Sequence, residues 1–364
     1  MDHDRRVEKL LIARLDHTGD CVETIPVLLD QLRKHEPDLT IDLLVSSVNK
    51  PFFESHPSIR RLISFDPPWL LPPKGRRYKR RQLYAIRSLE WLRLVWRERL
   101  WEYGQILFLS FSPWLLVYSA LLPSRRIGFR SPYQGRHHRK AVSLLHTTVH
   151  FNQSMHIRTN CVRMASEARR IELADEAPLP LRLPEFWDQH AEALLDELAV
   201  NSKPFVIIHP GGPDSFKSWP HKRFLDVAEA LADEIEVIIA LAPDALAKTD
   251  RLFDRSPHWR IRYLAPQSFA ELGAVMARAS LFIGNDGGPA HLAAALGIPT
   301  VAVFGPTDER VFGPRGCAEV RVIAERPCNS PCSYPWSMAP CSSPCPCLAN
   351  LSPDKVLRAA RELL

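Results

Sequence analysis

The sequence predicts an α/β protein made of two doubly wound domains, each built on a parallel sheet. Short apolar runs alternate with helical patterns along both halves of the 364-residue chain. This alternation is typical of parallel strands joined by right-handed helical crossovers. A chain of this length exceeds one hydrophobic core of ordinary size, and its 46% apolar and 24% charged residues are typical of a globular protein.

The N-terminal domain is expected over residues 1–175. Its first apolar run leads into a helical pattern with one apolar face, so a strand, a loop and a helix open the chain. Further apolar runs with helical stretches between them continue the alternation. The predicted strands are Val7–Arg14, Ile41–Val45, Arg61–Phe65 and Ile106–Leu109, and the apolar face of the first helix is Val22, Ile25, Leu28, Leu29 and Leu32.

A linker is expected over residues 176–203, where three prolines precede a helical pattern at Phe186–Leu198. The second domain is expected over residues 204–350, because the alternation of strands and helices restarts there. Its predicted elements are strands at Phe205–His209, Val237–Leu241, Ile261–Leu264, Leu281–Ile283 and Thr300–Phe304, and a helix at Pro220–Leu231.

Two helix starts carry capping signals. Ser268 is followed three residues later by Glu271, the spacing of a capping box. Ser352-Pro353 opens a terminal helix within residues 351–364, with proline in the first turn where it is favoured. This last helix is a candidate for crossing back to the N-terminal domain.

Charge is distributed unevenly between the halves. Residues 1–165 carry 27 Lys and Arg against 15 Asp and Glu, a net charge of +12, whereas residues 166–364 carry 20 against 26, a net charge of −6. Basic residues mixed with Trp and Leu at helical spacing favour contact with an anionic membrane or a phosphorylated acceptor. A simply solvated helix is the alternative. The candidate contacts are Lys79, Arg80, Arg81 and Arg87, and a second basic cluster runs from Arg125 to Lys140.

Nucleic acid is not an expected partner, because no nucleic-acid fold signature accompanies the basic residues. No apolar signal segment opens the chain at Met1–Leu10. The longest apolar stretch, Trp114–Leu122, is far shorter than the roughly 20 residues that span a bilayer. We therefore expect a cytoplasmic protein that lies at the inner face of the cytoplasmic membrane.

The most informative segment is Asn285–Gly297, which joins an apolar strand to a helix expected to begin near His291. Between them stand Asp286, Gly287 and Gly288. Backbone N–H groups and the positive end of the helix bind diphosphates at such junctions, and glycine lets a ligand approach the backbone closely. A tight turn before an ordinary helix is the alternative interpretation.

Two more loops follow predicted strands, where open α/β sheets bind ligands. Leu15–Asp20 follows the first strand, and Pro210–Pro220 follows the strand that opens the second domain. Asp20 either caps its helix or takes a proton from an attacking hydroxyl. Lys217 is either a solvated lysine or a point charge that neutralises a diphosphate. The loops of both domains are expected to contribute to one cleft.

Two common nucleotide motifs are absent. The second loop has Gly212 followed by Lys217-Ser218, but lacks the glycine that precedes the lysine in a P-loop. The dinucleotide fingerprint also fails, because Gly19 stands alone after the first strand.

The order of these motifs resembles that of the ADP-heptose:lipopolysaccharide heptosyltransferases, glycosyltransferase family nine, whose fold is GT-B. The resemblance spans both domains and is weak between residues of about 66 and 200. It rests on Arg14-Leu15, Thr18-Gly19-Asp20, Thr24-Ile25-Pro26, His209-Pro210-Gly211, Lys217, Trp219-Pro220, Arg223-Phe224, the 285–297 segment and Phe304-Gly305-Pro306-Thr307-Asp308.

The resemblance implies roles for individual residues. Asp20 is the general base toward the acceptor, and Lys217 balances charge on the leaving nucleoside diphosphate. Characterised heptosyltransferases often have Thr after the acid of the third loop, where this chain has Gly287. The donor-binding candidates are Thr18, Gly19, Gly211, Gly212, Lys217, Asp286, Gly287, Gly288 and His291, the last with helix packing as its alternative role.

Five cysteines lie within twenty residues near the end of the chain: Cys328, Cys332, Cys341, Cys345 and Cys347. Their spacing matches no standard zinc finger, although it could supply four thiolates. A structural metal or disulfide staple is the favoured interpretation, and a redox or cluster-binding role is the alternative.

The sequence thus predicts an inverting glycosyltransferase that needs no metal for catalysis. It would move a heptose or related sugar from an ADP-linked donor to a cell-envelope glycan or glycolipid such as lipopolysaccharide core. A nucleotide-sugar epimerase on the same fold and a non-catalytic, membrane-associated nucleotide-sugar-binding module are the rival functions.

Overall fold

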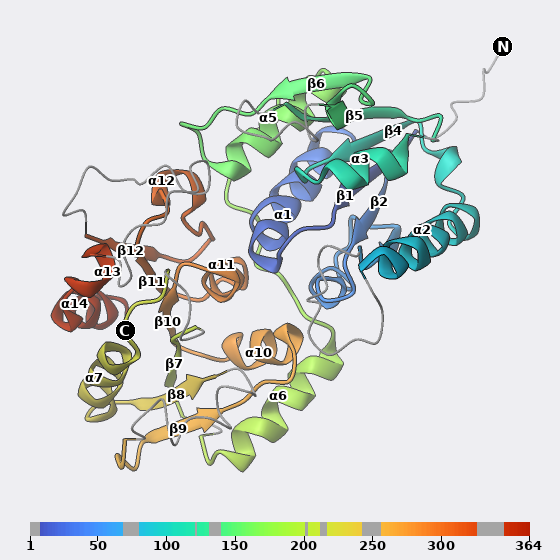
Figure 1. Ribbon diagram of the computed structural model, residues 1–364. Coiled ribbons are helices and arrows are strands. Elements are labelled where there is room, and N and C mark those ends of the chain that lie inside the picture. Colours follow the sequence, from blue (N-terminus) through green and yellow to red (C-terminus); the bar gives the residue numbers. More distant parts are fainter. Residues whose placement is uncertain are drawn as a thin grey trace. The chain divides into compact units, whose positions relative to one another are not determined.

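The computed structural model describes residues 8–67, 80–120, 122–130, 140–200, 203–211, 217–241, 256–325 and 346–364, with the backbone alone at 80–85, 113 and 114. Two compact units divide the chain, Met1–Glu176 and Ala177–Leu364. Each contains one six-stranded sheet in which all strand pairs are parallel. Figure 1 shows the helices that cover these sheets.

The sheet of the first unit has the order β3-β2-β1-β4-β5-β6. The order reverses between β1 and β4, which pair with Leu10 opposite Gln105 and Ala13 opposite Phe108. The strands are β1 (Lys9–Arg14), β2 (Thr40–Val45), β3 (Arg61–Ser64), β4 (Gln105–Phe108), β5 (Arg125–Arg130) and β6 (Thr147–His150). The helices are α1 (Thr18–His35), α2 (Arg80–Arg97), α3 (Pro113–Ser119) and α5 (Ile157–Arg169), with short 3₁₀ turns at η1 (Lys50–Phe52) and η2 (Leu100–Glu102).

Helices lie on both faces of this sheet, which explains why its strands are apolar on both sides. Leu11 and Ala13 of β1 face a core that includes Trp91 of α2 and Leu115 of α3. Helices α1 and α5 pack against each other, and α5 also contacts β5 and β6. The alternating residues of β1 are therefore buried on each face.

Two strands of this sheet, β5 and β6, were not predicted from the sequence. The segment of β5 has an arginine pair at its start and another arginine at its end, so its charge hid a central run that is buried in the sheet. Part of the predicted basic cluster is therefore a strand. A third unpredicted strand, β12, belongs to the second unit.

The sheet of the second unit has the order β12-β11-β10-β7-β8-β9, which repeats the order of the first when its strands are renumbered from β7. Its strands are β7 (Phe205–His209), β8 (Glu236–Ala240), β9 (Ile261–Leu264), β10 (Leu281–Asn285), β11 (Thr300–Phe304) and β12 (Val320–Ala324). Its helices are α6 (Glu185–Glu197), α7 (His221–Ala232), α10 (Phe269–Met276), α11 (Gly288–Ala295), α12 (Glu309–Phe312), α13 (Pro346–Ala349) and α14 (Pro353–Leu363).

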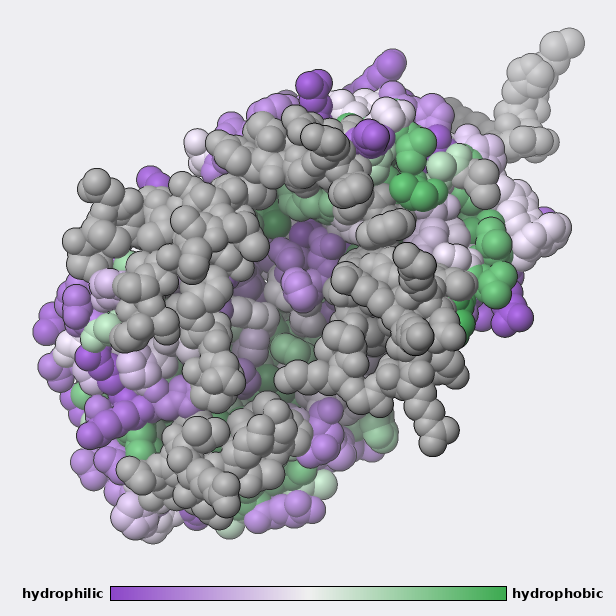
Figure 2. Space-filling model, in the orientation of Figure 1, coloured by the Kyte–Doolittle hydropathy of each residue, from purple (hydrophilic) through white to green (hydrophobic). Residues whose placement is uncertain are grey.

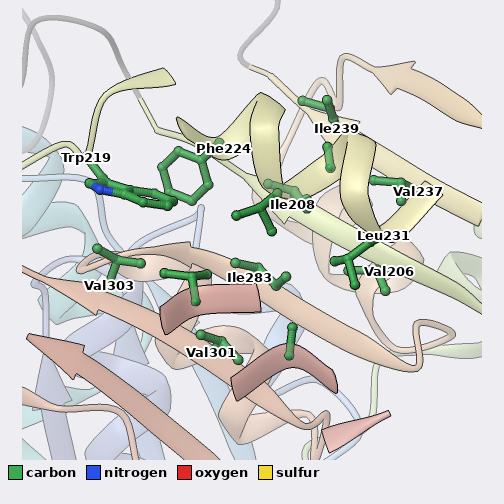
Figure 3. Close-up of a cluster of buried hydrophobic side chains, with 14 of the residues drawn as sticks. Val206, Ile208, Trp219, Phe224, Leu231, Val237, Ile239, Ile283, Val301 and Val303 are labelled. Atoms are coloured by element: carbon green, nitrogen blue, oxygen red, sulfur yellow. The ribbon is translucent and has the colours of Figure 1, made fainter. Parts of the chain in front are cut away.

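One face of this second sheet carries a large apolar core. Figure 3 shows Trp219 and Phe224 next to each other beside Ile208. The two rings meet edge to face, and their centroids are 4.8 Å apart. Helix α14 packs on α7 and on β10, β11 and β12, and Val356 and Ala360 join the core. These contacts of the terminal helix all lie within the second unit, and its return to the first domain stays a prediction.

The two predicted helix caps are confirmed. Ser268 accepts a hydrogen bond from the backbone N–H of Glu271 at 3.1 Å, and Ser352 accepts one from Asp354 at 3.2 Å. The predicted linker contains α6, which packs on α10 of the second unit. Within the residues that the structure describes, no helix combines the length and the apolar character needed to cross a bilayer.

Candidate functional site

The sequence-predicted loops lie at equivalent places in the two units. Asp16 and Asp20 follow β1, and β1 adjoins β4 where the strand order of the first sheet reverses. The loops after β7 and β10 flank the corresponding reversal in the second sheet. Open α/β sheets bind ligands at such switch points, outside the carboxyl ends of the strands. The topology therefore supports the choice of these loops as functional.

A buried arginine dominates the end of β1. The side chain of Arg14 is 1% exposed, and its Nη2 lies 3.4 Å from Oδ2 of Asp16 and 3.4 Å from Oδ1 of Asp20. Its Nη1 donates a hydrogen bond to Thr24 Oγ1 at 3.0 Å, and Thr24 in turn donates to the carbonyl oxygen of Asp20 at 2.8 Å. The guanidinium is therefore fixed beside both carboxylates.

Burial and charge act against each other in this cluster. Burial disfavours the charged form of Arg14, but the carboxylates of Asp20 and Asp16 outweigh it and raise the pKa of the arginine. Burial raises the pKa of Asp16 to about 6 against the attraction of Arg14. Burial likewise raises the pKa of Cys161, whose Sγ lies 3.5 Å from Arg14, to about 11. At neutral pH the cluster combines one cation with two carboxylates.

Helix α1 presents Asp20 at its first turn, preceded by Thr18 and Gly19. The side chain of Asp20 is 32% exposed, compared with 19% for Asp16. The backbone of α1 begins at Thr18 with His17 as its N-cap, so Asp20 is not the N-cap residue. Asp20 is therefore a partly exposed carboxylate beside a buried arginine, and it does not cap the helix.

The second unit brings Lys217 and Asp286 together. Nζ of Lys217 donates to Oδ2 of Asp286 at 3.0 Å, and the side chains are 24% and 6% exposed, respectively. The two residues come from different loops, one after β7 and one after β10. Lys217 is therefore held at the switch point and is not a freely solvated lysine.

Asn285 joins the same two loops from the end of β10. Its Nδ2 donates to the carbonyl oxygen of Pro210 at 2.6 Å, and its Oδ1 accepts from the backbone N–H of Trp219 at 2.8 Å. Gly211, next to Pro210, has a φ of +76°, a conformation that glycine adopts at little cost. Asn285 was not singled out from the sequence, because its role depends on contacts across more than sixty residues.

Trp219 and Arg223 belong to the motif of the second loop, and both hold the end of the chain. Trp219 donates its indole N–H to the carbonyl oxygen of Leu351 at 3.1 Å. Arg223 donates to the carbonyl oxygens of Leu351 and Ala349. These two residues therefore hold the end of the chain against the second loop by hydrogen bonds.

The helix after the third loop begins three residues earlier than predicted. Helix α11 begins at Gly288, so His291 lies in the first turns of the helix and Gly287 is the N-cap. A Cβ added to Gly287 would meet no atom closer than 3.8 Å, and its φ of 170° is ordinary extended backbone. Neither packing nor backbone strain therefore requires glycine at this position.

Two histidines border the second loop. Burial lowers the pKa of His209 to about 4 and that of His221 to about 4. Both imidazoles are thus neutral at physiological pH and add no charge beside Lys217.

Several predicted residues lie outside the described part of the chain: Gly212, Lys79, the side chains of Arg80 and Arg81, Cys328, Cys332, Cys341 and Cys345. Arg87 is described and forms an ion pair with Glu90. Cys347 is buried in the core of the second unit. Among the described residues there is no group of three or more His, Cys, Asp or Glu that could hold a metal ion.

Two Rossmann-like units, each built on a parallel six-stranded sheet, have the architecture of the GT-B class of glycosyltransferases. The model of glycosyltransferase family 9 (heptosyltransferase) matches residues 115–340, more than half of the chain. The chain belongs to this family.

Relatives and solved structures agree with this assignment over most of the chain. It is 27% identical over 302 residues to lipopolysaccharide heptosyltransferase 3 of Escherichia coli, covering 81% of this chain and 83% of that protein. It is 26% identical to lipopolysaccharide heptosyltransferase 1 of Pseudomonas aeruginosa, covering 89% and 86%. The structure of the E. coli heptosyltransferase WaaC with ADP is similar with a TM-score of 0.71 and 18% identity, covering 98% and 100%.

Proposed function

We propose that this glycosyltransferase moves a heptose or a related sugar, with inversion, from an ADP-linked donor to lipopolysaccharide core or another cell-envelope glycan. The observation that carries the proposal is the Lys217–Asp286 pair at the switch point of the second sheet. The names of the relatives, and the ADP bound to the similar WaaC structure, support this choice of donor and acceptor.

The donor half of the reaction belongs to the second unit. Lys217 supplies a compact positive charge for the leaving diphosphate, and the N-terminus of α11 adds backbone N–H groups. Asp286, which orients Lys217, stands next to Gly287, where a Cβ would meet only distant atoms. A donor can therefore approach the backbone there.

The acceptor half belongs to the first unit. Asp20 takes the proton of the acceptor hydroxyl, and the oxygen lone pair forms the new bond to the anomeric carbon. The bond from that carbon to the diphosphate breaks on the opposite face, and its electron pair leaves with the phosphate oxygen. The proton on Asp20 then passes to solvent, so the base is regenerated.

Catalysis in this scheme needs no metal, because Lys217 and the helix N-terminus stabilise the charge on the leaving diphosphate. Transfer should persist in the presence of a chelator such as EDTA. A loss of activity that added Mg²⁺ or Mn²⁺ restores would contradict this part of the proposal.

The direct test is a transfer assay with ADP-heptose and lipopolysaccharide core acceptors that lack one heptose. We expect release of ADP only when donor and acceptor are both present. Parallel calorimetry with ADP, UDP and GDP should show preference for ADP. Conversion of the donor without an acceptor would favour an epimerase, and the absence of nucleotide binding at millimolar concentration would favour a non-catalytic module.

We further propose that the protein acts in the cytoplasm, on the inner membrane surface, with α2 as the contact. Four of its apolar side chains are exposed, and Trp96 is 74% exposed. Arg93 and Arg97 are exposed on the same helix. Figure 2 shows hydrophobic residues at the surface on the right of the view, where α2 lies in Figure 1. The exposed row is Ile86, Leu89, Leu92 and Trp96.

This row shifts the proposed contact along the helix from Arg87, which is paired with Glu90, to the apolar side chains and Arg93. Co-sedimentation with vesicles that contain phosphatidylglycerol should fall in the Trp96→Ala variant. Trp259, which is 63% exposed in the second unit, provides the matched control, and Trp259→Ala should bind like the unaltered protein. Equal loss in both variants would contradict the assignment.

For the cysteine cluster we keep the proposal of a structural metal or disulfide staple. Metal analysis of the purified protein, together with thiol titration after unfolding, separates the alternatives. One zinc or iron per chain would support a metal staple, and eight reactive thiols without metal, one for each cysteine of the chain, would contradict both forms of staple.

A further inference from the structure

Two carboxylates share one guanidinium nitrogen at the end of β1. Nη2 of Arg14 lies 3.4 Å from Asp16 and 3.4 Å from Asp20, while Nη1 is taken up by Thr24. One buried cation therefore faces two anions. An arginine that paired with Asp20 alone would neutralise it completely, and the presence of Asp16 prevents this.

The buried thiols and the amide around the cluster do not change this balance at neutral pH. Cys21 on α1 and Cys161 on α5 face Arg14, and burial raises the pKa of each thiol, so both remain uncharged. Asn49 donates a neutral hydrogen bond to the carbonyl oxygen of Asp16 at 3.1 Å. His17, the residue after Asp16, is the other titratable group that acts on this carboxylate.

We infer that Asp16 is a positioning residue: it shares Arg14 with Asp20 and so leaves Asp20 basic enough to accept the acceptor's proton. This inference rests on the proposed function, in which Asp20 is the base. When the proton moves from the acceptor hydroxyl to Asp20, the cluster changes from a net charge of −1 to neutral. If Asp20 were paired with Arg14 alone, protonation of Asp20 would instead abolish the attraction between the two side chains.

The physical basis is the opposite action of the two neighbours. An arginine close to a carboxylate lowers its pKa by about 1–3 units, whereas a neighbouring carboxylate raises it. Burial, with a smaller contribution from the charge of Asp20, raises the pKa of Asp16 to about 6 against the attraction of Arg14. Asp20 is the more exposed member of the pair, which suits it to contact the acceptor and suits Asp16 to act behind it.

The experiment is the pH dependence of kcat/KM for transfer, compared between the unaltered protein and its Asp16→Asn variant. Without the charge of Asp16, Arg14 stabilises the ionised form of Asp20 alone. We expect the acidic limb of the pH profile of kcat/KM to move to lower pH by about one unit in Asp16→Asn. The value of kcat/KM on the plateau of the profile should fall about three- to tenfold, because Asp20 becomes a weaker base. Asp16→Glu keeps the charge and should restore the limb.

A matched control lies on the same helix. Asp30 of α1 pairs with His56 at 3.8 Å, away from Arg14, and Asp30→Asn makes the same change in net charge. This variant should leave the limb unchanged. The far-UV circular dichroism spectrum and the temperature of thermal unfolding should be equal in all variants and report that they are folded. If Asp16→Asn fails this check, Asp16→Ser replaces it.

The outcomes separate the inference from the proposed function. If Asp20→Asn retains full transfer, the base assignment is wrong. If Asp20→Asn is inactive but the limb of Asp16→Asn is unchanged or moves to higher pH, Asp16 does not act on Asp20 and the inference alone is overturned.

Discussion

The two units have the same strand order but carry opposite chemistry at the same place in the fold. At the switch point of the first sheet, two carboxylates compete for the buried Arg14. At the switch point of the second, Lys217 pairs with Asp286 beside two neutral histidines. The site of the first unit thus has one more negative than positive charge. The site of the second unit has a lysine close to the N-terminus of α11, where the helix begins with glycine.

This difference teaches that the sheet determines where a ligand binds and the residues after the strands determine what is done to it. A carboxylate that is not fully neutralised by a cation is suited to accept a proton. A lysine near a helix N-terminus suits a group that must receive a leaving diphosphate. In the proposed reaction, the same topology would therefore serve both halves of the transfer.

Removing the carboxylate of the first site should have the largest effect. We expect Asp20→Asn to lower the transfer rate about 10²-fold or more, because the acceptor hydroxyl loses its base. Binding of ADP should persist, because Lys217 and the third loop belong to the other unit. Steady-state kinetics with calorimetry measure both quantities, and a parallel loss of ADP binding would mean that the two units do not divide the work as proposed.

Removing the cation of the second site should have the next largest effect. Hydrogen bonds to charged groups contribute about 1.5–3 kcal/mol, so Lys217→Met should weaken donor binding by about 10- to 100-fold. Lys222 lies five residues away and is exposed on α7, so Lys222→Met is the matched control and should bind donor normally. Similar losses in the two variants would show that only the general charge of this region matters.

Local sequence patterns single out the residues with proposed roles more readily than the residues that hold them in place. Asp20, Lys217 and Asp286 stand directly after or near apolar strands, so local patterns were sufficient to find them. The role of Asn285 depends on Pro210 and Trp219, which are distant in sequence. Such a contact leaves no periodic signal.

Arg14 and Asp16 were missed as site residues for a related reason. Arg14 ends a strand whose other residues are apolar, and its hydrogen bond to Cys161 joins β1 to α5. Burial of a charge is decided by tertiary packing, which the local pattern does not reveal. The same limit explains β5, whose terminal arginines resembled a surface cluster until pairing with β4 and β6 buried its centre.

The units should also respond differently to acid. His209 and His221 have pKa values near 4 in the folded protein and about 6.5 when unfolded, so between these values the unfolded state binds more protons and the second unit loses stability as pH falls. Each contributes about 1–2 kcal/mol by pH 5. Asp16 acts in the opposite direction, because its raised pKa means that the folded first unit binds the extra proton between about pH 6 and 4.

Amide hydrogen exchange at pH 7 and 5, corrected for intrinsic rates, measures this difference unit by unit. We expect protection of β7 and β10 to fall more than that of β1 and β4. His221→Gln should reduce the acid sensitivity of the second unit. Equal loss of protection in both sheets would show that the two units unfold together or that the histidines are already solvated.

The smallest effect concerns Gly287, the N-cap of α11. Since a Cβ there would meet nothing closer than 3.8 Å, Gly287→Ala should leave stability within about 0.5 kcal/mol. If the donor fills that space, the methyl group should raise the KM for the donor about two- to tenfold with little change in kcat. Gly284 is the contrasting position, because a Cβ there would lie 2.6 Å from the ring of Phe282, so Gly284→Ala should destabilise the unit. An unchanged donor KM in a well-folded Gly287→Ala variant would mean that the donor does not approach the backbone at this glycine, and that the loop acts through Asp286 and Lys217 alone.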